Sequence, residues 1–311
     1  MTSSNTQKKI TLNNNSPMKR FSCFIGIDQT GASLAQGKKA KPLKTCLLQK
    51  QGRYWHGYTQ YKGNPLTLEG FTPSRLKNLF GNLEIDCPPS EIAIVADCVL
   101  GMPFSLAPKK RRSDKIQTLW ELFRQTVSHE FKGAKYGREV SEAFFSRFFN
   151  GTEMPPKRHC EELSGSNSLF TTRPFQKNIQ TGSYRIWRDL VSETNNPWLN
   201  IWPFNTPDNF TPNLPWLFEG YPSLLWKNIL GLPHRKSNLL IDKLNSAPMR
   251  QSFRFASSEK LSSDGDLCDA TVLALGGVML QDRDQLFTPF PTFWKLPHLQ
   301  TEGWICGLGD E

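Results

Sequence analysis

The sequence predicts an α/β protein in which helices cover a mixed sheet. Two short apolar segments that end at an acid, Phe21–Asp28 and Glu91–Asp97, have the length and composition of buried strands. Between them, Thr45–Gln49 and Arg53–Gln60 are separated by a Gln-Gly turn, which is typical of a β-hairpin. Helical and extended patterns then alternate towards the C-terminus, and this order favours strands and helices that share one core.

The remaining elements follow from apolar spacing and from the residues that flank it. Thr72-Pro73 precedes a short helix at Ser74–Phe80, because proline suits the first helical turn. Asp266–Leu280 is the last strong helix, with apolar residues at helical spacing. The other predicted elements are helices at Ser113–Phe131, Arg138–Phe149, Pro222–Leu230 and Ser237–Ser246, and strands at Trp216–Glu219 and Gly303–Leu308.

No repeat or linker divides the chain into two cores. We expect a disordered tail at residues 1–20, because this segment is rich in Ser, Asn and Thr, and a single domain at 21–311. The regular patterns at about 21–100 and 214–308 form the framework of that domain. Residues of about 104–212 are expected to form an inserted, largely helical middle subdomain.

The composition favours a basic protein with an anionic partner. The 311 residues include 38 Lys and Arg against 28 Asp and Glu, a formal charge of +10 that suggests nucleic acid. No apolar run approaches the roughly 20 residues of a membrane span. Seven irregularly spaced cysteines indicate neither a disulfide framework nor a zinc site. Because the N-terminus also lacks an apolar signal region, we expect a cytoplasmic protein with no membrane partner.

Acids stand at the ends of the apolar elements. Asp28, Asp97 and Glu219 each end a predicted strand, while Asp266 and Asp269 share one face of the last helix. Charge beside a core is unfavourable unless it is paired or binds a metal. Oxygen ligands suit Mg²⁺ or Mn²⁺, and a carboxylate cluster is what two-metal phosphodiester hydrolysis requires. Each acid also has a structural alternative, because acids commonly cap turns and helices.

Five motifs around these acids occur in a fixed order along the chain. They are FIGIDQTG at Phe24–Gly31, IVADCVLGMP at Ile94–Pro103, FEGYP at Phe218–Pro222, DLCDATVLAL at Asp266–Leu275 and EGWICG at Glu302–Gly307. Together they resemble a family of uncharacterised proteins described as predicted nucleases of the RNase H fold, domain of unknown function 429. In the middle third, only QTGSYRIWRDL at Gln180–Leu190 matches that family, and it does so weakly.

The resemblance implies a five-stranded mixed sheet flanked by helices and a nuclease active site. It makes Asp28, Asp97, Asp266 and Asp269 catalytic residues that bind Mg²⁺ or Mn²⁺, and Glu219 a further catalytic residue, either a ligand or a base. Asp97 departs from the pattern of Holliday-junction resolvases, which usually carry the longer Glu at that place. The activity of the family is itself inferred from fold, so the implied nuclease activity is an analogy.

Basic segments are candidates for contacts with a nucleic-acid backbone. Two such segments are Lys109, Lys110, Arg111 and Arg112, and His234, Arg235 and Lys236. Each has two interpretations, since a basic run either contacts phosphates or forms a solvated loop.

Two other functions match parts of the sequence. Gly26–Ser33 resembles the phosphate loop of actin-like ATPases, and Ala274–Gly277 faintly resembles their adenosine loop, although that group duplicates the fold. The second alternative is a non-catalytic nucleic-acid-binding module of the same fold. The positions of the acids favour metal-dependent cleavage of nucleic acid over both.

Overall fold

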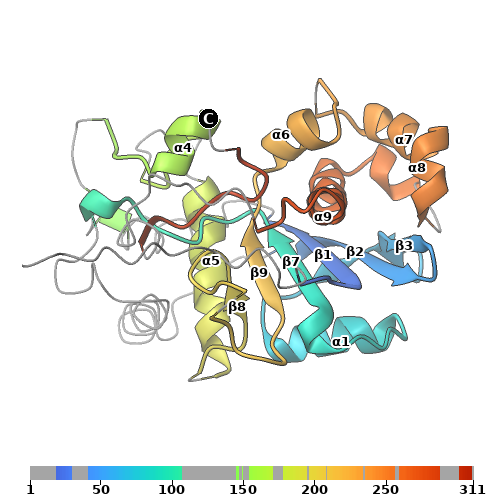
Figure 1. Cartoon of the computed structure of the whole chain (residues 1–311), viewed down its shortest axis with the longest axis horizontal. Coiled ribbons are helices and arrows are strands. Elements are labelled where there is room, and N and C mark those ends of the chain that lie inside the picture. The colour runs from blue at the N-terminus through green and yellow to red at the C-terminus, as the bar shows by residue number, and fades with distance from the viewer. Residues whose placement is uncertain are drawn as a thin grey trace, which may run out of the picture.

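The computed structural model describes residues 19–29, 41–106, 145–146, 149, 154–170, 178–194, 196–207, 209–233, 235–255, 259–287 and 301–309. Across these residues the protein has a mixed α/β architecture, with a central sheet between two layers of helices (Figure 1). The predicted helix at Ser113–Phe131, the basic run Lys109–Arg112, most of the Arg138–Phe149 helix and nearly all of the predicted tail at 1–20 lie outside the described residues.

The sheet is built around its first strand. β2 pairs antiparallel with β1, and β3 pairs antiparallel with β2, whereas β7 and β9 extend the other side of β1 in parallel. The spatial order is β10-β3-β2-β1-β7-β9-β8, with β6 beside β2. These strands are β1 (Cys23–Asp28), β2 (Leu43–Gln51), β3 (Tyr54–Tyr58), β6 (Thr67–Leu68), β7 (Ile92–Ala96), β8 (Asn200–Ile201), β9 (Trp216–Glu219) and β10 (Phe253–Phe255). A separate two-stranded ribbon consists of β4 (Gln60–Tyr61) and β5 (Asn64–Pro65).

Helices cover both faces of the sheet. In Figure 1, α6, α7, α8 and α9 lie on one face, and α1 and α5 lie on the other. The main helices are α1 (Pro73–Asn82), α4 (His159–Ser164), α5 (Asn178–Ser192), α6 (Pro222–Leu224), α7 (Ser237–Asn245), α8 (Ala247–Ser252) and α9 (Gly265–Asp282). Shorter helical turns are η1 (Pro89–Glu91), η2 (Phe104–Leu106), η5 (Leu225–Ile229) and η6 (Glu259–Ser262).

The two faces of the sheet carry separate cores because side chains alternate along each strand. In β1, Ile25 and Ile27 pack in the core beneath α1 and α5, whereas Phe24 packs in the core beneath α9. β7 repeats this pattern, with Ile94 on the first face and Val95 on the second. Both strands are therefore buried on both faces, which explains why their sequences are almost continuously apolar.

Helix α9 lies directly against β1, and Gly26 makes this close approach possible. A Cβ atom at position 26 would lie 1.9 Å from the carbonyl oxygen of Ala270 and 2.6 Å from the backbone nitrogen of Ala274. No side chain fits in that space, so glycine is required there for a packing reason. The contact brings the first turn of α9 to the carboxyl end of β1.

Two expectations about the framework need correction. The sheet has eight strands and not five, because the short strands β6, β8 and β10 are added to the long ones. The strand predicted at Gly303–Leu308 is wrong: Ile305 makes one isolated parallel bridge, and Gly303 and Gly307 have left-handed φ angles of 69° and 80° that interrupt an extended segment. The helix predicted at Pro222–Leu230 is confirmed: it begins at Pro222 as α6 and continues to Ile229 as the π-helical turn η5.

Part of the segment predicted as an insertion belongs to the layers around the sheet. Ile186, Trp187 and Leu190 of α5 are buried in the same core as Ile25 and Ile94. Strand β8 from this segment also pairs in parallel with β9. The division into a framework and an insertion remains a prediction. Among the described residues, no helix has both the length and the apolar character that crossing a bilayer requires.

Candidate carboxylate site at the ends of the parallel strands

Three of the predicted acids meet at one edge of the sheet. Asp28 is the last residue of β1, Asp97 follows β7 directly, and Glu219 is the last residue of β9. These three strands are neighbours and run parallel, so their carboxyl ends lie side by side. In open α/β sheets, ligands bind outside the carboxyl ends of the strands. The arrangement therefore forms a candidate site from three of the acids that the sequence singled out.

Asp28 and Asp97 interact directly. Their carboxyl groups share a hydrogen bond in which protonated Asp28 donates to Asp97. Desolvation raises the pKa of Asp28, and the charges of Asp97 and Asp266 raise it further, while Arg235 lowers it. Desolvation also raises the pKa of Asp97, although Arg235 and the hydrogen bond with Asp28 oppose this effect. The pair therefore retains a proton more readily than isolated aspartates do.

Asp266 reaches this pair from the first turn of α9. Its side chain is exposed, and its charge acts on both Asp28 and Asp97. It does not cap the helix, since the N-cap is Asp264, whose carboxylate accepts a hydrogen bond of 3.0 Å from the backbone nitrogen of Leu267. One structural alternative for Asp266, that of an N-cap, is therefore excluded, whereas the other, a favourable charge in the first turn of the helix, agrees with its position. Its carboxylate is available at the edge of the cluster.

Asp269 is held by neighbours outside the Asp28–Asp97 pair. The indole nitrogen of Trp226 donates to its Oδ1 at 2.7 Å, and the guanidinium of Arg235 contacts both of its carboxylate oxygens. Arg235 itself is half exposed and also lowers the pKa of Asp28 and Asp97. Its positive charge thus acts on three aspartates, Asp28, Asp97 and Asp269. Arg235 belongs to the second basic segment, for which contact with phosphates and a solvated loop both remain predictions; His234 lies outside the described residues.

Glu219 is engaged by a different arginine. Nη1 and Nη2 of Arg158 donate to its two carboxylate oxygens at 2.8 and 2.5 Å, and the backbone nitrogen of Leu100 donates at 2.8 Å. Arg158 also donates to Glu161 at 2.9 Å and to the carbonyl oxygen of Glu302 at 2.8 Å. Both members of the pair are almost completely buried. Glu219 therefore fixes α4, the loop after β7 and the C-terminal segment around the end of β9.

A small cavity lies between Asp97 and Glu219. It has a volume of about 120 Å³, and its walls include Asp97, Arg158, Ile179, Glu219 and Tyr221. Ile179 comes from the first turn of α5, so the cavity lies between the sheet edge and a helix of the predicted insertion. It joins Asp97 and Glu219, which the sequence predicted as catalytic residues, in one concave surface.

Gln29, which follows Asp28, is a residue that the sequence prediction did not single out. Its side chain is 8% exposed and packs against Gly182 of α5, where a Cβ atom would overlap its Oε1. Within the described part of the chain, that Oε1 atom has no hydrogen-bond partner. Arg158 and Trp226 were also missed. An isolated arginine or tryptophan carries no local signal, because its partners lie about 60 or 40 residues away.

The donor chemistry of the site fits a hard cation only in part. Asp28, Asp97 and Asp266 offer oxygen ligands that suit Mg²⁺ or Mn²⁺. Across the described residues, however, no group of three or more Asp, Glu, His or Cys side chains is arranged so that it could hold a metal ion. Asp269 and Glu219 are bound to arginines, as given above.

Comparisons with known proteins do not identify the chain: no protein-family model, no curated protein and no solved structure matches it. The resemblance to domain of unknown function 429 therefore depends on the five sequence motifs alone.

Proposed function

We propose that this protein is a divalent-metal-dependent phosphodiester hydrolase of the RNase H fold that acts on nucleic acid. The observation that carries the proposal is the hydrogen-bonded pair Asp28–Asp97 at the carboxyl ends of two adjacent parallel strands. Counted among the long strands in chain order, β1 is the first and β7 the fourth. These are the two places where the sequence resemblance expects the first two metal-binding acids.

The cofactor that we propose is Mg²⁺ or Mn²⁺, because carboxylate oxygens suit these ions. Asp28 and Asp97 would supply two carboxylates, and exposed Asp266 is the third candidate because its charge already acts on both. A bound ion of this kind stabilises negative charge on a phosphate and makes a bound water more acidic. Because the three acids repel one another, a cation at this place would also relieve their mutual destabilisation.

Residues of the chain itself would prepare the site for a phosphodiester. Arg235, fixed by Asp269 and half exposed, presents a guanidinium that can pair with a phosphate oxygen. Glu219 and Arg158 hold the backbone after β7 through the bond to Leu100, and thereby position Asp97. In the absence of a cation, the Asp28–Asp97 pair keeps a proton between its carboxyl groups.

A nuclease assay with point variants tests the proposal. Fluorescent single-stranded DNA, duplex DNA, RNA, an RNA–DNA hybrid and a branched junction would each be incubated with Mg²⁺ or Mn²⁺. We expect metal-dependent cleavage of at least one substrate, and a loss of about 100-fold or more in Asp28→Asn and in Asp97→Asn, because each removes a carboxylate ligand. Asp282→Asn is the matched control, since this exposed acid lies at the opposite end of α9.

Activity that persists undiminished in Asp28→Asn and Asp97→Asn would refute the assignment of the site. Absence of cleavage with every substrate and both metals would refute the activity.

A second function is favoured by the two arginines. Because Arg158 binds Glu219 and Arg235 binds Asp269, two of the five predicted acids are already neutralised by protein side chains. This arrangement suits a nucleic-acid-binding module without catalysis. Tight binding of an oligonucleotide that neither Mg²⁺ nor Mn²⁺ changes, with no cleavage, would support this alternative.

A further inference from the structure

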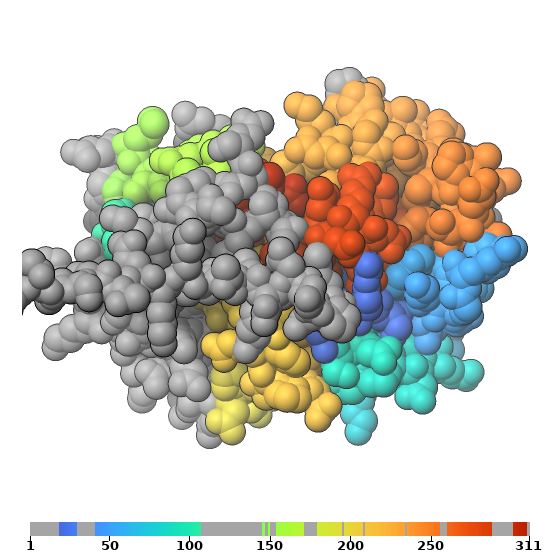
Figure 2. All heavy atoms as spheres, in the orientation of Figure 1, coloured from blue at the N-terminus to red at the C-terminus, as the bar shows by residue number. Residues whose placement is uncertain are grey.

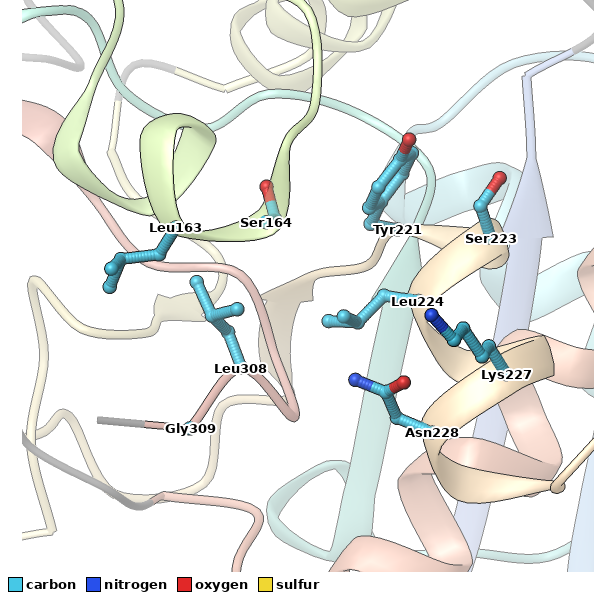
Figure 3. A pocket seen from close by; sticks show the side chains of 9 residues that line it. All are labelled: Leu163, Ser164, Tyr221, Ser223, Leu224, Lys227, Asn228, Leu308 and Gly309. Carbon is cyan, nitrogen blue, oxygen red and sulfur yellow. The ribbon is translucent and has the colours of Figure 1, made fainter. Parts of the chain in front are cut away.

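A larger cavity lies beside the carboxylate site, between α4, the turn α6–η5 and the C-terminal segment. Its volume is about 390 Å³, within the range of small-ligand sites. Figure 3 shows Leu224, Lys227 and Asn228 pointing from α6–η5 into this space, with Leu163 and Leu308 on the opposite side. Its lining consists of Leu163, Ser164, Tyr221, Ser223, Leu224, Lys227, Asn228, Leu308 and Gly309.

The π-helical turn η5 accounts for the polar side of the cavity. The backbone nitrogen of Leu230 donates to the carbonyl oxygen of Leu225 at 3.0 Å, five residues earlier, as in a π-helix. In this turn Leu225, Trp226 and Ile229 are buried, whereas the two residues between them, Lys227 and Asn228, are exposed. Single π-turns within helices are often found at functional sites.

The polar side chains of the cavity are available to a ligand. Within the part of the chain that the structure describes, no hydrogen bond or ion pair engages the side chains of Lys227, Asn228 or Tyr221. The ammonium of Lys227 and the amide of Asn228, on successive residues, can together bind a phosphate and its ester oxygens.

The apolar side of the cavity suits a flat or weakly polar group. Leu224 and Leu308 belong to a small buried cluster beneath the cavity, while Leu163 is 40% exposed at its rim. The leucines and the ring of Tyr221 offer an apolar surface for a sugar or a base. The cavity therefore combines polar groups that can bind an anion with apolar groups that can contact a ring.

This cavity lies next to the carboxylate site. Tyr221 lines both the larger cavity and the small one that contains Asp97 and Glu219. On the other side, Ser223 accepts a hydrogen bond of 3.3 Å from Arg235, which contacts Asp269. Tyr221 and Ser223 therefore place the lining of the cavity beside residues of the carboxylate site.

We infer that this cavity binds one nucleotide of a nucleic-acid strand, next to the phosphodiester at the carboxylate site. The phosphate lies on Lys227 and Asn228, and the sugar or base lies on Leu163, Leu308 and the ring of Tyr221. This inference rests on the proposed function for the class of its ligand, but it concerns binding and requires no metal or cleavage.

Binding of an oligonucleotide in the absence of divalent metal tests the inference. The probe is a fluorescein-labelled single-stranded 12-nucleotide DNA in EDTA, measured by anisotropy at several salt concentrations. We expect Lys227→Gln to weaken binding by about fivefold and to reduce the slope of log affinity against log salt by about 0.7, as the loss of one phosphate contact does. Leu163→Trp, which narrows the cavity from its exposed rim, should weaken binding without changing that slope.

The control is Lys77→Gln, because Lys77 is an exposed lysine on α1, on the opposite face of the sheet. Equal effects of Lys227→Gln and Lys77→Gln would overturn the inference, since they would indicate general electrostatic attraction. Competition by thymidine monophosphate but not by inorganic phosphate at the same ionic strength supports a nucleotide site. Equal competition by both would leave only an anion contact and would overturn the assignment of the apolar wall.

The two proposals fail separately. Cleavage that Asp28→Asn abolishes, together with binding that Lys227→Gln leaves unchanged, refutes the cavity inference alone. Binding that depends on Lys227, without any cleavage, supports the cavity and refutes the hydrolase. If the wild-type protein binds no oligonucleotide in EDTA, the cavity inference alone is refuted, and the cleavage assay with Mg²⁺ or Mn²⁺ decides the hydrolase.

Discussion

Arg158 and Glu219 form a buried ion pair that joins the beginning of α4 to the end of β9, with nitrogen–oxygen distances of 2.8 and 2.5 Å. Both side chains are almost inaccessible to solvent. The pair connects two positions that are 61 residues apart in the sequence. Because the same guanidinium also binds Glu161 and the carbonyl oxygen of Glu302, one side chain links three parts of the chain around the candidate site.

Removal of one partner of this pair should destabilise the protein strongly. We expect Arg158→Met to lower the free energy of unfolding by about 3–5 kcal/mol, because it leaves Glu219 buried without a counter-charge. The measurement is chemical denaturation followed by circular dichroism. Arg53→Met, at an exposed arginine of the β2–β3 turn, is the control and should change stability by no more than about 0.5 kcal/mol. In the double variant Arg158→Met/Glu219→Gln, the loss should be smaller than the sum of the two single losses; an additive result would contradict the pairing.

Asp28 should make the stability of the metal-free protein depend on pH. Its pKa is raised in the folded state, mainly by desolvation, so the folded protein binds more protons than the unfolded chain above the unfolded pKa of about 4. Stability therefore falls as the pH rises towards the folded pKa. Asp28→Asn should remove this contribution, and its melting temperature should exceed that of the wild type most at high pH. A melting temperature of the wild type that rises over this range relative to Asp28→Asn would contradict the raised pKa.

Arg235 should influence the ionisation of Asp28 and Asp97, although the carboxylate that it binds is that of Asp269. Its charge lowers the pKa of both Asp28 and Asp97. Arg235→Gln should therefore raise both pKa values, which carboxyl ¹³C chemical shifts followed against pH would measure. Lys236→Gln, at the neighbouring exposed residue, is the matched control. Unchanged titration in Arg235→Gln would place the guanidinium away from the pair.

Replacement of Gly26 by alanine should destabilise the protein strongly, whereas replacement of Gly81 should not. Gly26→Ala places a Cβ atom 1.9 Å from the carbonyl oxygen of Ala270, so either α9 or β1 has to move. We expect strong destabilisation, measured by the denaturation midpoint, and poor expression. Gly81→Ala in α1 meets no atom within 4 Å, and alanine in a helix should stabilise the protein by about 0.5–1 kcal/mol. A mild effect at Gly26 would show that the helix and the strand adjust easily.

The strongest local patterns predicted the framework well. β1 and β7 are apolar because both of their faces are covered, and such runs are recognisable without tertiary information. Thr72 caps α1 through a hydrogen bond of 3.4 Å from the backbone nitrogen of Arg75, as the Thr-Pro sequence predicts. The short strands β6, β8 and β10 were missed, because an alternation of apolar and polar residues cannot be recognised over two or three positions.

The positions of the acids could be predicted, but their partners could not. Strand ends and helix starts are local properties, so the sequence by itself determined that Asp28, Asp97 and Glu219 stand at element ends and that Asp266 and Asp269 share the beginning of a helix. Which of these acids influence one another's pKa, and which form ion pairs, depends on the packing of α4, α9 and the loop before α7. Only the tertiary structure decided that the charge of Asp266 raises the pKa of Asp28 and Asp97. It also decided that Glu219 forms an ion pair with Arg158, and Asp269 with Arg235. The physical reason is that an ion pair forms through space, between residues that carry no signal of each other along the chain.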